Sequence, residues 1–270
     1  MKIALFYFSG TGNTERIAEA IAGELTEINV EIHTFNITSY KERQQKYDLA
    51  PYNAYIFGFP IYAWRVPEVV RKWLKSLNGE GKRCATFFTY GGVAVGAAHY
   101  DTKEILEGSN FNLIGSSEFP GKHTFNLAGW DFLESRPDRG DFDVAKKFAR
   151  KILKRFQEKE ISRIEIEDPM IPTKLLERFE SRKKTRPKPS RRGKECSMCR
   201  TCEEVCPSRA MNADTGEADN DKCLRCLRCM INCPDNVLEI DDMTKLSEII
   251  LNANNITKHE LERRDSKIYC

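Results

Sequence analysis

The sequence predicts an α/β fold, in which a five-stranded parallel sheet carries helices on both faces and a small α+β module follows it. In the first 160 residues, short apolar runs rich in β-branched or aromatic residues alternate with segments of helical periodicity. Such alternation implies parallel strands joined by crossover helices. Eight of the ten cysteines then fall between Cys196 and Cys233, which indicates a second unit with its own chemistry.

The expected strands are five apolar runs of strand length. In chain order they read KIALFYF, VEIHTF, AYIFGF, CATFFT and LIGSSEF. The expected helices, in which apolar residues recur with helical spacing, are Asn13 to Leu25, Val66 to Leu77, Ala94 to Leu106 and Phe142 to Phe156. These elements place a first domain over residues 1–160.

The remainder of the chain divides by composition into three parts. Residues 161–194 contain prolines and a basic stretch, KKTRPKPSRR, so we expect a linker with one short docking helix at IPTKLLERF. Residues 195–241 carry the clustered cysteines and ten acids against five bases, and form the expected second domain. Residues 242–270 are expected to be a helical tail. Attraction between the cationic linker and the acidic domain predicts that the linker holds this domain docked.

The N-terminus MKIALFYFSGTGNT lacks the architecture of a signal peptide. No stretch approaches the ~18 to 20 apolar residues that cross a bilayer. We therefore expect a cytoplasmic protein without membrane insertion, in which clustered cysteines are metal ligands and not disulfides. The basic run carries no nucleic-acid-binding motif, so we expect no nucleic-acid partner. The oligomeric state stays open.

The cysteine spacing CxxCxxCxxxCP occurs twice in the second domain. Its eight cysteines are Cys196, Cys199, Cys202 and Cys206 in the first run, and Cys223, Cys226, Cys229 and Cys233 in the second. Three cysteines spaced by two residues wrap three corners of an iron–sulfide cube, and the fourth ligand comes from elsewhere. Zinc is the alternative, but each run offers a close third thiolate that a tetrahedral zinc knuckle does not use. The spacing favours two [4Fe-4S] clusters.

On these two runs, residues 195–241 resemble the bacterial two-cluster ferredoxins, in which the fourth cysteine of each run ligates the other cluster. The resemblance implies one cluster on Cys196, Cys199, Cys202 and Cys233, and the other on Cys223, Cys226, Cys229 and Cys206. Ferredoxins carry single electrons at low potential. The resemblance therefore also implies an electron-transfer role.

A glycine-rich loop, SGTGNT, joins the first strand directly to a helix. Backbone N–H groups and hydroxyls at such a junction bind anions. The sequence lacks GxxxxGK[ST] and GxGxxG, which disfavours triphosphate and dinucleotide ligands. The stretch FSGTGNT resembles the FMN phosphate loop of flavodoxins, and this resemblance extends over residues 1–160. It implies that the phosphate is held by Ser9, Gly10, Thr11, Gly12, Asn13 and Thr14.

Two further loops, FPIYAWR and TYGGVAVGA, follow the third and fourth strands, at the edge of the sheet where ligands of such folds bind. In flavodoxins these loops sandwich the isoalloxazine ring. The resemblance implies ring contacts from Pro60, Ile61, Tyr62 and Trp64 on one loop, and from Thr89, Tyr90, Gly91 and Gly92 on the other. The alternative for the three aromatic residues is packing against helices. The two loops contain Arg65 and no acidic residue, which predicts weaker repulsion of a reduced, anionic flavin than in flavodoxins with acids around the ring.

The segment SEFPGKHTFNLAGWDF, after the fifth strand, is longer than a connection needs. We expect a lid over the flavin, with Lys122 or His123 facing a bound substrate. His33 and His99 are expected to be packing or surface residues, and Cys84 to be an inert buried thiol.

The combination resembles flavodoxin–ferredoxin fusion proteins of anaerobic bacteria and archaea. It implies electron transfer between a low-potential one-electron carrier, the two clusters in series and FMN, which then exchanges electrons with a redox partner protein. One alternative is an FMN-dependent reductase of a small molecule, fed by its own ferredoxin domain. Another is a redox-sensing module. The sequence identifies no catalytic residue, donor or acceptor, and does not give the direction of electron flow.

Overall fold

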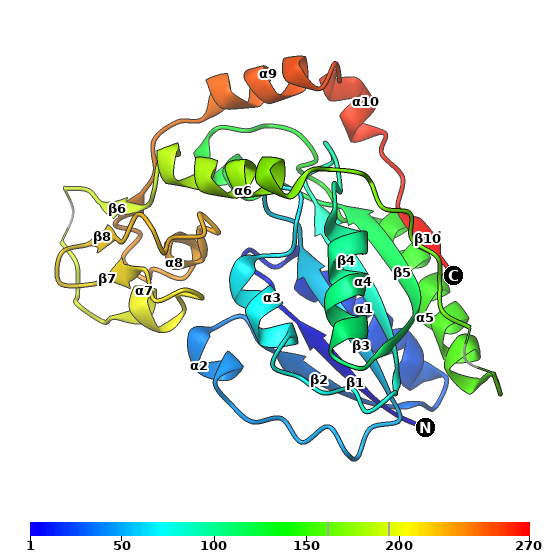
Figure 1. Ribbon diagram of the computed structural model, residues 1–270. Coiled ribbons are helices and arrows are strands. Elements are labelled where there is room, and N and C mark those ends of the chain that lie inside the picture. Colours follow the sequence, from blue (N-terminus) through cyan, green and yellow to red (C-terminus); the bar gives the residue numbers. More distant parts are fainter. Residues whose placement is uncertain (161, 194) are drawn as a thin grey trace.

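The computed structural model describes residues 1–160, 162–193 and 195–270, and at residue 183 the backbone only. Its centre is a six-stranded sheet of order β10-β5-β4-β3-β1-β2 (Figure 1). The five parallel strands are those that the apolar runs predict: β1 Lys2–Tyr7, β2 Glu31–Asn36, β3 Ala54–Pro60, β4 Arg83–Tyr90 and β5 Asn112–Pro120. β3 and β5 are buried along their whole length, as expected of strands covered on both faces.

The sixth strand, β10 (Lys267–Tyr269), pairs antiparallel with β5, with Lys267 opposite Glu118. The Ser117 hydroxyl donates to the Lys267 carbonyl at 2.7 Å. The expected helical tail is therefore wrong in its last part, and the sheet has one more strand than predicted. Three residues are too few for a periodic pattern to reveal a strand.

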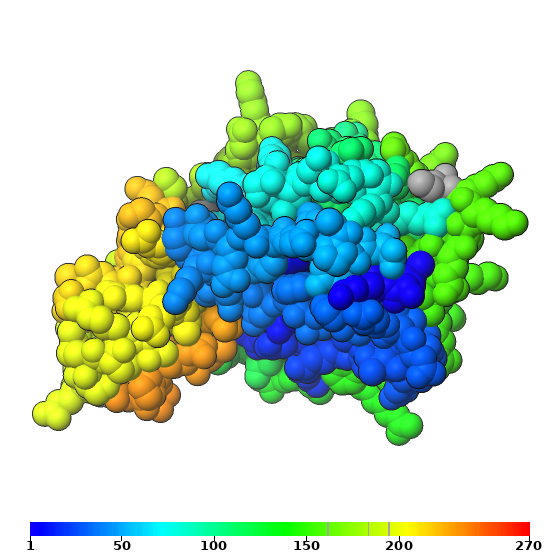
Figure 2. Space-filling view, turned by 90° about the horizontal axis from the view of Figure 1, so that it is seen from below, coloured from blue at the N-terminus to red at the C-terminus, as the bar shows by residue number. Residues whose placement is uncertain are grey.

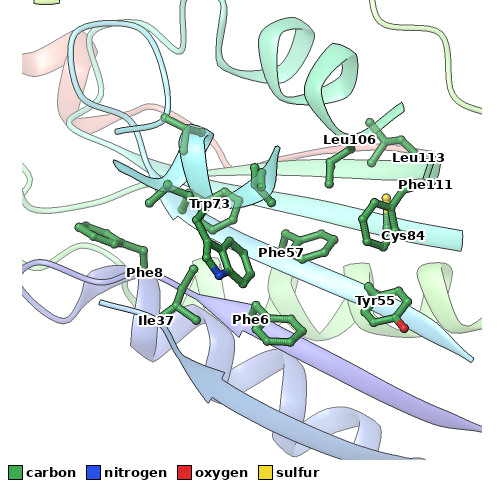
Figure 3. Close-up of a cluster of buried hydrophobic side chains, with 14 of the residues drawn as sticks. Phe6, Phe8, Ile37, Tyr55, Phe57, Trp73, Cys84, Leu106, Phe111 and Leu113 are labelled. Carbon is green, nitrogen blue, oxygen red and sulfur yellow. The ribbon is translucent and has the colours of Figure 1, made fainter. Parts of the chain in front are cut away.

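Two helices cover each face of the sheet. α1 (Asn13–Glu27) and α5 (Arg139–Gln157) bury their apolar sides on one face, and α3 (Glu68–Leu74) and α4 (Ala98–Gly108) on the other. α3 begins later than the sequence predicts because Pro67 occupies its N-cap. Figure 3 shows the second of these cores, in which the Trp73 ring lies 5.4 Å from Phe6 and 6.4 Å from Phe57, measured between centroids.

The cysteine module is built on a four-stranded antiparallel sheet. Its strands are β6 Ser190–Arg191, β7 Met211–Asn212, β8 Glu217–Ala218 and β9 Leu238–Glu239, in the order β7-β8-β6-β9. Two one-turn helices, α7 (Thr201–Glu204) and α8 (Arg228–Ile231), lie within the cysteine runs, with Cys202 in α7 and Cys229 in α8. Because β6 is a central strand of this sheet, the module begins before residue 195, inside the expected linker. At the β7–β8 turn, the Asn212 side chain accepts from the N–H of Asp214 at 2.9 Å.

The segments before and after the module lie against the first domain. The docking helix forms as α6 (Thr173–Ser181), and η2 (Arg182–Thr185) follows it. After the module, α9 (Thr244–Ala253) and α10 (Lys258–Glu262) pass from the small sheet back to the large one (Figure 1). No helix in the described ranges combines the length and apolar character that a membrane span needs.

The module rests directly on the first domain beside α2 (Tyr40–Arg43), as Figure 2 shows from below. The buried Arg43 guanidinium donates to the carbonyls of Ile37, at 2.8 Å, and of Pro207. The Arg209 guanidinium lies 5.0 Å from the centroid of the Tyr40 ring. These contacts fix the module to the carboxyl-terminal edge of the large sheet.

Candidate functional site

A pocket lies at the carboxyl ends of β1, β3 and β4, where ligands of doubly wound sheets bind. The pocket is lined by Ser9, Gly10, Thr11, Asn13, Thr14, Pro60, Ile61, Tyr62, Thr89, Tyr90, Gly91, Gly121, Lys122, His123 and Thr124. The structure therefore brings together residues from the phosphate-type loop, both expected ring loops and the expected lid.

The loop after β1 offers free backbone donors. The Ser9 hydroxyl oxygen accepts from the N–H of Gly12 at 3.1 Å and of Glu15 at 3.3 Å, which shapes the turn into α1. In the part of the chain that the structure describes, the N–H groups of Gly10, Thr11, Asn13 and Thr14 have no acceptor. They line the pocket at the positive end of α1 and suit a phosphate group.

Glycines allow the backbone to approach the pocket closely. A Cβ at Gly10 would lie 2.6 Å from the Tyr62 hydroxyl oxygen, and a Cβ at Gly91 would overlap the His123 ring. Glycine at these two positions lets the Tyr62 hydroxyl and the His123 ring pack directly against the backbone of the loops.

Hydrogen bonds join the loop after β1 to three neighbouring segments. The hydroxyls of Thr14 and Thr89 share a buried hydrogen bond of 2.7 Å. The Asn13 side-chain amide donates to the Lys122 carbonyl at 2.6 Å, and the Ser9 N–H donates to the Thr38 hydroxyl oxygen at 2.8 Å. The pocket is preorganised, so ligand binding requires little ordering of these loops.

Three of the fourteen expected FMN-loop residues, Gly12, Trp64 and Gly92, do not line the pocket. Left-handed backbone at Ala63 and Trp64, with φ of 53° and 68°, turns the indole onto Phe179 of α6 at 4.4 Å between centroids. Trp64 therefore packs against a helix, which was the alternative for it. At Gly92 the neighbours are Leu133 and Leu261 of the lid and the C-terminal segment.

The two remaining aromatic residues, Tyr62 and Tyr90, do line the pocket. Burial raises the pKa of Tyr90 to about 12. Burial also raises the pKa of Tyr62 far above its ordinary value, and the nearby Cys226 adds to the effect. Both phenols are therefore neutral at physiological pH, and their rings provide flat faces for stacking.

The lid contributes more to the pocket than the sequence predicts. Its first part, η1 (Thr124–Ala128), follows lining residues Gly121, Lys122 and His123. The His123 ring stacks on Trp130 at 4.2 Å, and its Nδ1 accepts from the Phe125 N–H at 3.0 Å. Burial, with Arg186 nearby, lowers the pKa of His123 to about 4. The imidazole is therefore neutral at pH 7, and its hydrogen is on Nε2.

Arg65 is not the unopposed cation that its sequence neighbours imply. Its guanidinium pairs with Asp101 at 2.5 Å and lies 3.9 Å from Glu180. Asp101 belongs to α4 and Glu180 to α6, so neither is close to Arg65 in sequence. These two carboxylates offset the positive charge of Arg65, so the expected weakening of the repulsion on an anionic reduced flavin is reduced.

The cysteines form two spatial groups. A hollow is lined by an outer group that combines three cysteines of the first run with the last of the second: Cys196, Cys199, Cys202 and Cys233. The inner group consists of Cys206, Cys223, Cys226 and Cys229. Cys206, Cys223 and Cys229 pack in one apolar cluster. Burial raises the pKa of Cys226 to about 12, with Cys206 and Cys223 adding to the effect. Burial also raises the pKa of Cys229, with smaller effects from Cys226, Cys206, Cys223 and Cys202 of the outer group.

Among the described residues, no three His, Cys, Asp or Glu side chains are arranged to ligate one metal ion.

The inner group lies against the phosphate-type loop. A Cβ at Gly10 would be 3.2 Å from Cys226 Cβ. Arg228 Nη1 donates to the Ser9 carbonyl at 3.1 Å, and Leu224 packs on the core of the first domain. Sequence reasoning missed this junction because no local pattern relates residues 219 positions apart.

The fold and the loops around the pocket define a doubly wound α/β protein with a candidate ligand site at the carboxyl ends of its strands. The family model named Flavodoxin domain matches residues 4–112, and the N-terminal part of the chain is a flavodoxin domain. A flavodoxin from Clostridium saccharobutylicum is 35% identical over 101 residues, or 36% of this chain. The chain spans 61% of the length of that curated relative.

Two solved structures also resemble this part of the chain. A flavodoxin from the domain Archaea aligns with a TM-score of 0.44 and 20% identity, over 58% of this chain and 100% of its own. The Streptococcus pneumonia TIGR4 flavodoxin aligns with a TM-score of 0.42 and 15% identity, over 57% of this chain and 99% of its own.

Proposed function

We propose that this chain transfers electrons between two [4Fe-4S] clusters and a bound FMN, and so links one-electron carriers to a flavin-dependent redox partner. The observation that carries the proposal is the contact between the inner cysteines and the flavin pocket, where Cys226 lies on Gly10. FMN, when bound, exchanges one or two electrons, whereas each cluster carries one.

The pocket supports FMN as its ligand. The free N–H groups of the loop after β1 suit the phosphate, and they need no cationic side chain to do so. Tyr62, on the loop after β3, and Tyr90, at the end of β4, both line the pocket, and aromatic rings suit a flat heterocycle. The flavodoxin domain over residues 4–112 supports the same ligand.

The two cysteine groups support two clusters. Around the outer hollow, Cys233 joins the three closely spaced cysteines of the other run, as the ferredoxin resemblance implies. The inner group has the reciprocal composition, with Cys206 beside the cysteines of the second run. Eight thiolates in two such groups suit two cubes, and the module between residues 190 and 239 provides their scaffold.

Purification without oxygen tests the proposal, with flavin, iron, sulfide and zinc measured per chain. We expect about one flavin, and about eight irons with a matching amount of sulfide. Stoichiometric zinc with little iron would show that the cysteines serve another purpose. Protein with iron but no flavin, even after addition of FMN, would support a redox-sensing module.

A second candidate is direct reduction of a small molecule by the flavin. It is favoured by the lid, because Lys122 and the neutral His123 line the pocket and an Nε2–H group can donate to a substrate. Replacing His123 with Gln should then slow reduction of a small acceptor and leave electron transfer to a protein acceptor unchanged. Equal effects on both acceptors would contradict a role for His123 in reduction of a small molecule.

A further inference from the structure

The two cysteine groups differ in their exposure to solvent. In the outer group Cys199 is exposed and the neighbouring Met198 is 41% exposed. In the inner group Cys206, Cys223 and Cys226 are at most 8% exposed. Cys229, the fourth inner cysteine, is partly exposed, so the inner group is the more enclosed of the two and the outer group the more accessible from solution.

The inner group is the one in contact with the flavin pocket. Cys226 lies against Gly10, and the Tyr62 phenol contacts the same glycine position from inside the pocket. Arg228, two residues after Cys226, is anchored on the Ser9 carbonyl. This junction consists of side chains and backbone already packed together, so no domain movement is needed to bring it about.

The two groups are also adjacent to each other. Cys202 and Cys233 of the outer group pack in the same apolar cluster as Cys206, Cys223 and Cys229 of the inner group. From solvent to pocket, the order is therefore outer group, inner group, loop after β1.

We propose that the inner cysteines, Cys206, Cys223, Cys226 and Cys229, hold the cluster proximal to the flavin, and that external one-electron carriers exchange electrons only at the outer group. This inference rests on the proposed function and adds the order of its centres. Each passage moves one electron from a reduced one-electron donor through the outer and then the inner group. Two passages, with two protons from water, complete the reduction of one flavin.

The charge of the bound ligand provides a readout of this order that is independent of activity. FMN carries an anionic phosphate, so its binding disfavours adding negative charge to the nearer cluster more than to the farther one. By thermodynamic reciprocity, reduction of the nearer cluster raises the dissociation constant of FMN by the same factor by which bound FMN lowers the equilibrium constant for reduction of that cluster. We expect this factor to be roughly threefold to tenfold for the inner group and close to one for the outer group.

Two ligand variants separate the groups. Cys199→Ala should retain only the inner cluster, and Cys223→Ala only the outer one, with iron per chain about halved in each. The reduction potential of the remaining cluster is measured by EPR titration, in FMN-free and FMN-loaded protein. FMN should lower this potential in Cys199→Ala and leave it nearly unchanged in Cys223→Ala. An equal or larger effect in Cys223→Ala would overturn the order.

A matched pair of arginine variants tests the order in a chain that keeps all its cysteines. Arg228→Ala removes the contact with Ser9, whereas Arg200 lies on the outer face, paired with Glu203 at 3.1 Å. After mixing with dithionite, Arg228→Ala should slow the concentration-independent reduction of the flavin about tenfold. Arg200→Ala should change only the concentration-dependent phase. A slower concentration-independent phase in Arg200→Ala, with no such change in Arg228→Ala, would contradict the inference. An absence of iron from the parent protein would instead contradict the proposed function itself.

Discussion

The indole N–H of Trp130 donates a hydrogen bond of 2.9 Å to the carbonyl of Met243, which lies 113 positions further along the chain. The Leu133 N–H likewise donates to the Glu262 carboxylate at 2.6 Å. Both contacts join the lid over the flavin pocket to the segment that follows the cysteine module. The lid is thus held down by residues that belong to neither cofactor site.

Leu261 is the apolar centre of this attachment and is completely buried. Replacing it with Ala should lower the free energy of unfolding by about 2–5 kcal/mol, because the cavity left between lid and α10 cannot collapse fully. Hydrogen exchange should also rise across residues 121–133. The control is Ile249→Ala on α9, which is 62% exposed and should change the free energy by less than about 0.5 kcal/mol. Equal effects in urea titrations would show that the attachment is not specific.

Gly10→Ala should weaken FMN binding by about tenfold or more, because the added Cβ would be 2.6 Å from the Tyr62 hydroxyl oxygen. Gly23, inside α1, has open space around its Cβ position, so Gly23→Ala should leave binding unchanged and stabilise the helix by about 0.5–1 kcal/mol. Dissociation constants from the quenching of FMN fluorescence measure both effects. Unchanged affinity in Gly10→Ala would place the ligand elsewhere.

Cys226→Ala should reduce iron per chain to about half, since one cluster loses a ligand and the other keeps four. Cys270 is exposed and far from both groups in sequence, so Cys270→Ser should retain the full complement. Iron and sulfide assays after anaerobic reconstitution, together with absorption spectra, provide the measurement. Full iron content in Cys226→Ala would refute the ligand assignment.

The lowered pKa of His123, about 4 because of burial, predicts a pH-dependent stability. Between pH 6.5 and about 4 the unfolded chain binds a proton at this residue that the folded chain does not. The free energy of unfolding is therefore undiminished by His123 above pH 6.5, and it decreases as the pH falls from 6.5 toward 4. Urea midpoints at pH 7 and pH 5 should differ less in His123→Gln than in the parent. An identical difference in both proteins would indicate that His123 is accessible to water.

Local patterns were sufficient to predict most of the first domain. β3 is apolar along its whole length because both of its faces are covered, and Ser9 to Thr14 carry the loop chemistry in consecutive residues. β10 and β6 were missed because two or three residues carry no periodicity. Trp64 was misplaced because the left-handed backbone at Ala63 and Trp64 directs the indole away from the pocket. The pattern of apolar residues carries no information about the backbone angle φ.

Tertiary relationships account for the rest of what was missed. The hydrogen bond from Arg228 to Ser9 and the ion pair between Arg65 and Asp101 each join residues far apart in sequence. Contacts of this kind depend on how elements far apart in the chain pack together, and no local sequence pattern predicts that packing.

The pairing of β10 with β5 also bears on how the chain is made. On the ribosome, β5 emerges long before Lys267 to Tyr269, and the whole cysteine module is synthesised in between. The nascent flavodoxin domain therefore has an open strand edge while the module acquires its shape, and such an edge is prone to wrong pairing. Synthesis under iron limitation should consequently leave this edge uncovered for longer, and lower the yield of the first domain along with that of the second.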